Sequence, residues 1–198
     1  MTLLLASRSA TRRRMLADAG VRFALVDASL DEEAAKLDVM ASSAADARML
    51  AGKLAEAKAL SAAAPADALV LGADQVLETE QGAVLSKAAS RLELRDQLRR
   101  LAGKSHRLHS AASIVQNGTP VWSATESAKL VMRDFSDAFL EAYLDRNFES
   151  VRWNVGGYAI EGAGAQLFDR IEGSHFAILG LPLIPLLAFL RERSMIAA

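Results

Sequence analysis

A short polar segment interrupts an apolar run and gives the first indication of chemistry. Asp74 and Gln75 stand inside the otherwise apolar run from residue 68 to residue 77. A carboxylate at the end of a buried strand must be paired with a cation, solvated in a cleft or bound to a metal ion. The small neighbours Gly72 and Ala73 leave room for a ligand to approach. Asp74 is therefore a candidate catalytic group, and an aspartate that caps a turn is the structural alternative.

The amino-terminal segment has the groups that bind phosphate. Ser7 and Ser9 stand between a short apolar run and the expected start of a helix. Free backbone N–H groups and the helix dipole favour an anion at such a place. Arg12 and Arg13 add charge, and a guanidinium can hold phosphate with two donors. The G-x-x-x-x-G-K-S/T pattern of a Walker loop is absent, and a plain helix cap with solvated arginines is the alternative.

Further polar residues could act on a nucleotide, although each has a simpler structural explanation. Lys87 follows a short predicted strand and could reach a phosphate as a point charge. Glu161 lies between glycine-rich segments, which permit close approach of the backbone to a flat ligand. It could read donor groups on the edge of a base, and Tyr158 could stack on that base. Glu32, in an acidic segment, and Lys58, on a predicted helix, are by default solvated residues.

The composition excludes several function classes. The 198 residues fit one domain or at most two small lobes. The 23 basic and 24 acidic residues give a net charge of −1, which gives no support for nucleic acid as a partner. The chain has no cysteine, which excludes disulfides and thiol catalysis and is compatible with a reducing compartment. No stretch approaches the roughly 18 apolar residues of a membrane helix. We expect a cytoplasmic protein without a membrane partner.

The predicted elements mix hairpins with β–α units. We expect an acidic loop over 30–36 and a tight hairpin turn at Asn117-Gly118. Apolar runs and turn residues predict strands over 2–6, 22–27, 68–77, 83–85, 106–116 and 121–133. Capping residues and stop signals predict helices over 9–19, 44–63, 90–101, 136–145 and 182–193. This order favours an α/β domain, bordering on α+β, with a mixed sheet rather than a purely parallel one.

In their order along the chain, these motifs resemble the Maf-like nucleoside triphosphate pyrophosphatases over nearly the full length. Residues 5–13 resemble the family's opening L-A-S-x-S-P-R/W-R, with Ala10 and Thr11 as departures. Further matches are the acidic pair at 31–32, the L-A-x-x-K-A helix at 54–59, the G-A/S-D-T/Q segment at 72–75, the lysine at 87 and the L-S-G-x-x-H segment at 101–106.

The resemblance implies a single domain over residues 1–198, with no separable linker. Its fold would be an elongated mixed β-sheet flanked by helices, with two lobes around a deep cleft, similar to Maf and ITPase proteins. The implied reaction cleaves a nucleoside triphosphate between the α and β phosphates with the help of a divalent cation, Mg²⁺ or Mn²⁺. A homodimer is also suggested. By position, Asp74 would be the general base, Glu32 and Asp74 would hold the metal, and Ser7, Arg12, Lys58 and Lys87 would hold the triphosphate. Arg13, Gln75 and Glu161 are further expected substrate-binding residues.

The preferred base is indicated by a few positions. Gln75, Glu161 and residues 167–173 look closer to the branch of the family that acts on 7-methyl-GTP. A carboxylate suits the N1–H and amino donors of guanine and the positive charge of a methylated base. Residues 158–160 resemble instead the branch that acts on dTTP and UTP, which is the alternative.

A reading without catalysis also follows from the sequence. Four positions depart from residues that are common in the resembled family: Ala10, Thr11, Asn154 and Ala177. These departures leave open a nucleotide-binding regulator of cell division without significant turnover.

Overall fold

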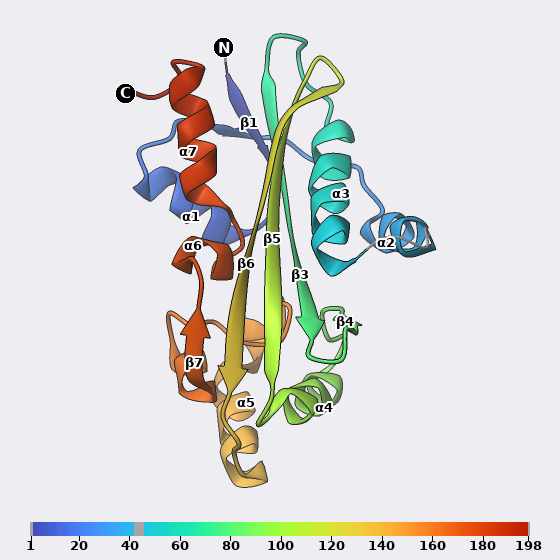
Figure 1. The fold of residues 1–198 in the computed structure, drawn as a ribbon, viewed down its shortest axis with the longest axis vertical. Helices are drawn as coiled ribbons and strands as arrows, with labels where there is room; N and C mark the ends of the chain where they lie inside the picture. The colour runs from blue at the N-terminus through green and yellow to red at the C-terminus, as the bar shows by residue number, and fades with distance from the viewer. Residues whose placement is uncertain (1, 42–45, 198) are drawn as a thin grey trace. The chain divides into compact units, whose positions relative to one another are not determined.

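The computed structural model describes residues 2–41 and 46–197 (Figure 1). Its strands are β1 (Leu3–Ala6), β2 (Ala24–Leu25), β3 (Leu69–Thr79), β4 (Val84–Leu85), β5 (Ser105–Gln116), β6 (Thr119–Met132) and β7 (Phe168–Glu172). Its helices are α1 (Ala10–Asp18), α2 (Glu32–Ala41), α3 (Ala47–Leu60), α4 (Arg91–Leu101), α5 (Asp137–Val151), the 3₁₀ helix η1 (Ala163–Leu167), α6 (His175–Ile178) and α7 (Leu183–Glu192). No helix of this described part is long and apolar enough to cross a membrane.

The strands form one mixed sheet, as the sequence predicts. Their order is β2-β1-β3-β5-β6-β7, and β4 pairs with β3. The strand β1 runs parallel to β2 and to β3, whereas the β3–β4 and β6–β7 pairs are antiparallel. Asn117 and Gly118 have φ values of 48° and 69°, which the tight turn between β5 and β6 requires. The α/β class with a mixed sheet is therefore confirmed.

The chain forms two compact units. The first comprises residues 1–75, 109–127 and 174–198, and the second comprises residues 76–108 and 128–173. The second unit contains α4 and α5, which are joined by ion pairs. Arg91 Nη2 lies 2.8 Å from Glu141 Oε2, and Arg95 Nε lies 2.5 Å from Glu141 Oε1.

The first unit has helices on both faces of its part of the sheet (Figure 1). Alternate residues of β3, Leu69, Leu71 and Ala73, pack in a cluster with residues of α1 and α7. The intervening Val70 packs in a second cluster that contains Ala59 of α3. Because neighbouring strand residues point to opposite faces, α1 and α7 cover one face and α3 covers the other.

The structure corrects one predicted element and adjusts others. The expected acidic loop over 30–36 is wrong, because α2 begins at Glu32 and Asp31 Oδ1 accepts a hydrogen bond from Ala34 N at 3.1 Å. Three acidic residues in a row suggested a solvated loop, but an acidic first turn also stabilises a helix start. The predicted helix over 44–63 corresponds to α3, and the positions 44 and 45 lie outside the described residues. The sequence also did not indicate the short helix α6.

Candidate functional site

Lys58 lies between two carboxylates in the first unit. Its Nζ is 2.5 Å from Asp74 Oδ1 and 3.2 Å from Glu32 Oε1. The side chains of Lys58 and Asp74 are 10% and 13% exposed, whereas that of Glu32 is 54% exposed. Three of the predicted site residues are therefore in contact, and the Lys58–Asp74 pair is largely shielded from water.

Gly72 permits this contact because it lets α3 lie directly against β3. A Cβ atom at Gly72 would stand 2.1 Å from the carbonyl oxygen of Ala55 and 2.7 Å from the backbone nitrogen of Ala59. Both atoms belong to the helix backbone and cannot turn away. A residue with a side chain would push the helix off the strand, and with it Lys58, which stands in the last turn of α3.

The alternation of β3 sends Asp74 and Gln75 in opposite directions. Asp74 has the same parity as Val70 and meets Lys58 of α3. Gln75 has the parity of Leu71 and Ala73, which pack with α1 and α7. Its Nε2 lies within hydrogen-bond distance of three acceptors, Ser110 Oγ at 2.9 Å and the carbonyl oxygens of Ala177 and Ile178 at 3.0 Å. The amide nitrogen of Gln75 is therefore hydrogen-bonded inside the first unit.

Arg12 connects three segments of the same unit. Its Nε donates to Gly180 O at 2.7 Å, and its Nη1 donates to Ala73 O at 3.0 Å and to Ser7 Oγ at 3.3 Å. Burial lowers the pKa of the Arg12 guanidinium, and the negative charges of Asp74 and Glu32 oppose that shift. Ser9 is the N-cap of α1, as predicted, because its side chain accepts a hydrogen bond from Arg12 N. Arg12 is thus close enough to Asp74 and Glu32 for their charges to act on it.

The remaining predicted residues are placed differently. Arg13 lies in α1, and its Nε is buried without a hydrogen-bond partner among the described residues. Lys87 is exposed in the segment after β4, and Glu161 is exposed in the turn before η1. Both belong to the second unit. Their roles stay predictions.

The donor set fits a divalent cation that is shared with a ligand. Among the described residues, no group of three or more histidine, aspartate and glutamate side chains is arranged to hold a metal ion. Glu32 and Asp74 nevertheless lie against one ammonium group, so the site already accommodates a positive charge. Mg²⁺ is usually bound through one or two carboxylates together with substrate phosphates. Two carboxylates are thus enough for a cation that arrives with a nucleotide.

Comparison with known proteins identifies the family. The profile of the family described as Maf-like protein matches residues 2–193. The chain belongs to this family. A protein of Sphingopyxis alaskensis named nucleoside triphosphate pyrophosphatase is 46% identical over 196 residues, which cover 98% of each chain. Proteins with the same name from Caulobacter vibrioides and Paramagnetospirillum magneticum are 46% and 48% identical, over 94% and 96% of this chain and 93% and 97% of their own.

One expectation for the second unit of this Maf-like chain is wrong. Tyr158 does not offer a face for stacking on a base, because it is 5% exposed and its ring packs edge-on against Phe168 at 4.8 Å. Its hydroxyl is hydrogen-bonded to His106 Nε2 at 2.7 Å. Burial raises the pKa of Tyr158 and lowers that of His106 to about 4. Tyr158 is therefore part of the core. The adjacent glycines predict an open loop, but in the structure Tyr158 packs inside the protein.

Sequence reasoning also missed Ser110 and the turn that ends α6. Ser110 is fully buried, and its Oγ donates to Ala177 O at 2.6 Å. The only signal was a hydroxyl inside an otherwise apolar strand, since a buried polar group needs a partner. The departure at Ala177 is harmless to this contact, because the residue takes part through its carbonyl group.

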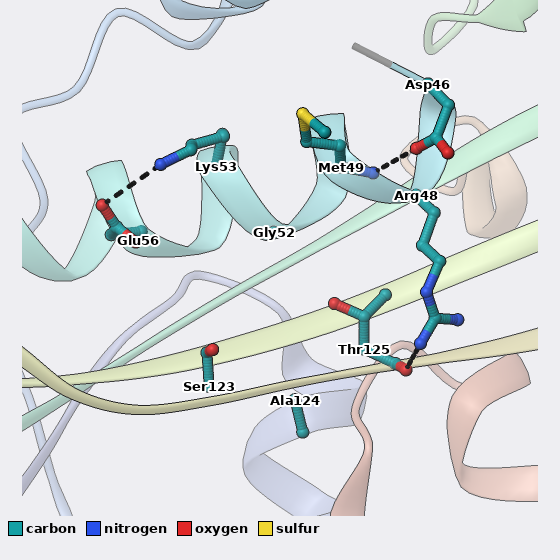
Figure 2. A pocket seen from close by; sticks show the side chains of 9 residues that line it. All are labelled: Asp46, Arg48, Met49, Gly52, Lys53, Glu56, Ser123, Ala124 and Thr125. Carbon is teal, nitrogen blue, oxygen red and sulfur yellow. Dashed lines mark hydrogen bonds and ion pairs between the residues drawn. The ribbon is translucent and has the colours of Figure 1, made fainter. Parts of the chain in front are cut away.

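A separate groove of about 480 Å³ lies between α3 and β6 in the first unit (Figure 2). Its lining residues are Asp46, Arg48, Met49, Gly52, Lys53, Glu56, Ser123, Ala124 and Thr125. Arg48 reaches across it and donates to the carbonyl oxygen of Thr125 at 2.5 Å (Figure 2). None of the predicted site residues lines this groove, so it does not hold the chemistry described above.

Proposed function

We propose that this Maf-like chain hydrolyses nucleoside triphosphates between the α and β phosphates, which yields the monophosphate and pyrophosphate. The observation that carries the proposal is the shielded carboxylate of Asp74, which is in contact with Lys58. Lys58 also contacts the second acid, Glu32, and the charges of both acids act on the guanidinium of Arg12. The names of relatives that are 46% to 48% identical along almost the whole chain support it.

The geometry suits a reaction that depends on charge neutralisation and an oriented nucleophile. Lys58 occupies Oδ1 of Asp74, which leaves the second carboxylate oxygen to accept a proton from water. As that proton leaves, the water oxygen bonds to a phosphorus atom of the α–β anhydride, and the bond from that phosphorus to the bridging oxygen breaks. The two products are the monophosphate and pyrophosphate. The ammonium group of Lys58, next to Asp74, would stabilise the charge of the phosphates. Ser7 and Arg12, which are hydrogen-bonded to each other, are further candidates for contact with the phosphates.

Glu32 and Asp74 are the residues that would hold a divalent cation, Mg²⁺ or Mn²⁺. Such a cation supplies further neutralisation of phosphate charge when it is bound. Glu32 is suited to this role because it stands at the first residue of α2 and is half-exposed, so a nucleotide with its cation can reach it.

For the base we propose a preference for 7-methyl-GTP. Glu161 supports it, because an exposed carboxylate can accept hydrogen bonds from guanine and favours a positively charged ring. Gln75 gives no support, since its amide nitrogen is hydrogen-bonded to Ser110 and to carbonyl oxygens at the end of α6. The alternative within the family is a dTTP and UTP pyrophosphatase. A cytoplasmic location accompanies the proposal, supported by the absence of cysteine.

The test is pyrophosphate release by the purified protein with Mg²⁺ on dTTP, UTP, CTP, GTP and 7-methyl-GTP. The Asp74→Asn variant is expected to lose at least about 10²-fold in kcat, since the general base is absent. Asp67→Asn is the matched control, because Asp67 is exposed just before β3. Release that survives in Asp74→Asn would overturn the role of Asp74. Nucleotide binding with no release by the wild type would favour the regulator, and faster release from dTTP would favour the alternative base preference.

A further inference from the structure

The two residues that flank Asp74 are both hydrogen-bonded to other segments. On one side, the carbonyl oxygen of Ala73 accepts a hydrogen bond from Arg12 Nη1 at 3.0 Å. On the other side, Nε2 of Gln75 donates to the carbonyl oxygens of Ala177 and Ile178, both at 3.0 Å. The backbone that carries Asp74 is therefore held from both neighbours.

Arg12 and Gln75 both donate hydrogen bonds to one turn, formed by residues 177–180. Arg12 Nε donates to Gly180 O at 2.7 Å, and Ser110 Oγ donates to Ala177 O at 2.6 Å. Gly180 has a φ of 101°, a backbone conformation that residues with a side chain rarely adopt. A Cβ there would stand 3.4 Å from two nitrogens of Arg12, so the glycine also leaves room for the guanidinium.

We propose that Arg12 and Gln75 are positioning residues, which hold Asp74 against the turn at 177–180, and that this is their main contribution to the reaction. The inference rests on the proposed pyrophosphatase function. It assigns to both residues a role different from the direct substrate contact expected from the sequence. Ser110 belongs to the same arrangement, since its Oγ lies 2.9 Å from Gln75 Nε2 and donates to Ala177 O.

The chemistry of the contacts supports this assignment. The acceptors of Arg12 are two backbone carbonyls and a serine hydroxyl, which need donors in fixed directions rather than charge alone. A planar guanidinium supplies such a fork, whereas a lysine ammonium is a single point charge on a flexible stem. Small displacements of a catalytic group are costly, because a shift of about 1 Å can reduce a rate about 10²-fold.

The first experiment separates positioning from substrate binding in Gln75→Met and Ser110→Ala. Ser110 has no exposed surface, so it cannot touch a nucleotide. We expect kcat to fall about 10-fold or more in Gln75→Met and by a smaller factor in Ser110→Ala. The Kd of a non-hydrolysable nucleotide analogue should stay within about threefold of the wild type in both variants. Thermal unfolding identifies a variant that does not fold.

The second experiment compares Arg12→Lys with Arg12→Gln. If the fork positions Asp74, the lysine variant should lose kcat nearly as strongly as the glutamine variant. If Arg12 mainly binds phosphate by charge, the lysine variant should keep most of the activity, and the glutamine variant should raise KM with little change in kcat. That result, or a Kd in Gln75→Met that weakens in parallel with the loss of kcat/KM, would overturn the inference. Absence of pyrophosphate release by the wild type would instead refute the proposed function.

Discussion

Nζ of Lys58 lies 2.5 Å from Oδ1 of Asp74, and the same nitrogen lies 3.2 Å from Oε1 of Glu32. One ammonium group therefore balances two acids that would otherwise repel each other in a partly buried place. Removal of any one of these three side chains would therefore change the electrostatic environment of the other two.

Removal of the Lys58 ammonium should affect both activity and stability. In Lys58→Met we expect kcat/KM to fall about 10²-fold or more, because a cation that stabilises the phosphates is lost. Unfolding should become easier by up to about 3 kcal/mol, because Asp74 would remain shielded without its partner. Lys53→Met is the control, since Lys53 is on the same helix with a side chain 56% exposed. Pyrophosphate release and urea unfolding measure the two effects, and equal behaviour of the two variants would contradict the prediction.

Metal dependence should be strict and should involve Glu32. Chelation with EDTA is expected to abolish pyrophosphate release, and added Mg²⁺ should restore it. In Glu32→Gln, the Mg²⁺ concentration for half-maximal activity should rise about 10-fold, because a neutral amide is a weaker ligand for a hard cation. Glu33→Gln serves as the control, since Glu33 is the exposed neighbour on the same helix. A Mg²⁺ requirement unchanged in Glu32→Gln would show that this residue does not hold the metal.

The sequence indicated the strands and most helices because their signals are local. Ser9 and Ser136 cap helices in the structure as the sequence predicts, and Asn117-Gly118 makes the tight turn. The contact of Lys58 with Asp74 depends on how α3 packs against β3, and local signals along the chain do not show this packing. From the sequence alone, a lysine on a helix is expected to be solvated. Lys58 is instead buried, because Gly72 allows α3 to lie directly against β3. The partners of Gln75 could not be predicted for the same reason. Gln75 and Asp74 are neighbours in the chain, but they point to opposite faces of the sheet and contact different elements.

Gly72 should tolerate no side chain. In Gly72→Ala we expect a loss of about 3 kcal/mol in the free energy of unfolding and reduced activity, because the new Cβ would overlap the backbone of α3. Gly52→Ala is a matched control on the face of the same helix. Its new Cβ would meet only Thr125 Oγ1, at 3.8 Å, so the better helix propensity of alanine should stabilise by about 0.5 to 1 kcal/mol. Urea unfolding of both variants measures the difference, and a tolerated alanine at position 72 would contradict the packing argument.

His106 should make the stability of the protein depend on pH. It is 1% exposed and hydrogen-bonded to Tyr158, and burial lowers its pKa from 6.5 to about 4. The unfolded chain therefore binds more protons than the folded one between these two values, so stability must fall as the pH drops through that window. From pH 7 to pH 5 the loss due to this one residue should be about 2 kcal/mol.

The contribution of His106 can be isolated by subtraction, because acidic residues add their own dependence on pH. The His106→Gln variant should be less stable than the wild type at pH 7. The gap between the two proteins should shrink by about 2 kcal/mol at pH 5, since glutamine does not titrate. His175→Gln, which changes an exposed histidine, should follow the wild type at both values. Urea unfolding at the two pH values gives the gap directly, and a gap that stays constant would mean that His106 is not held neutral by burial.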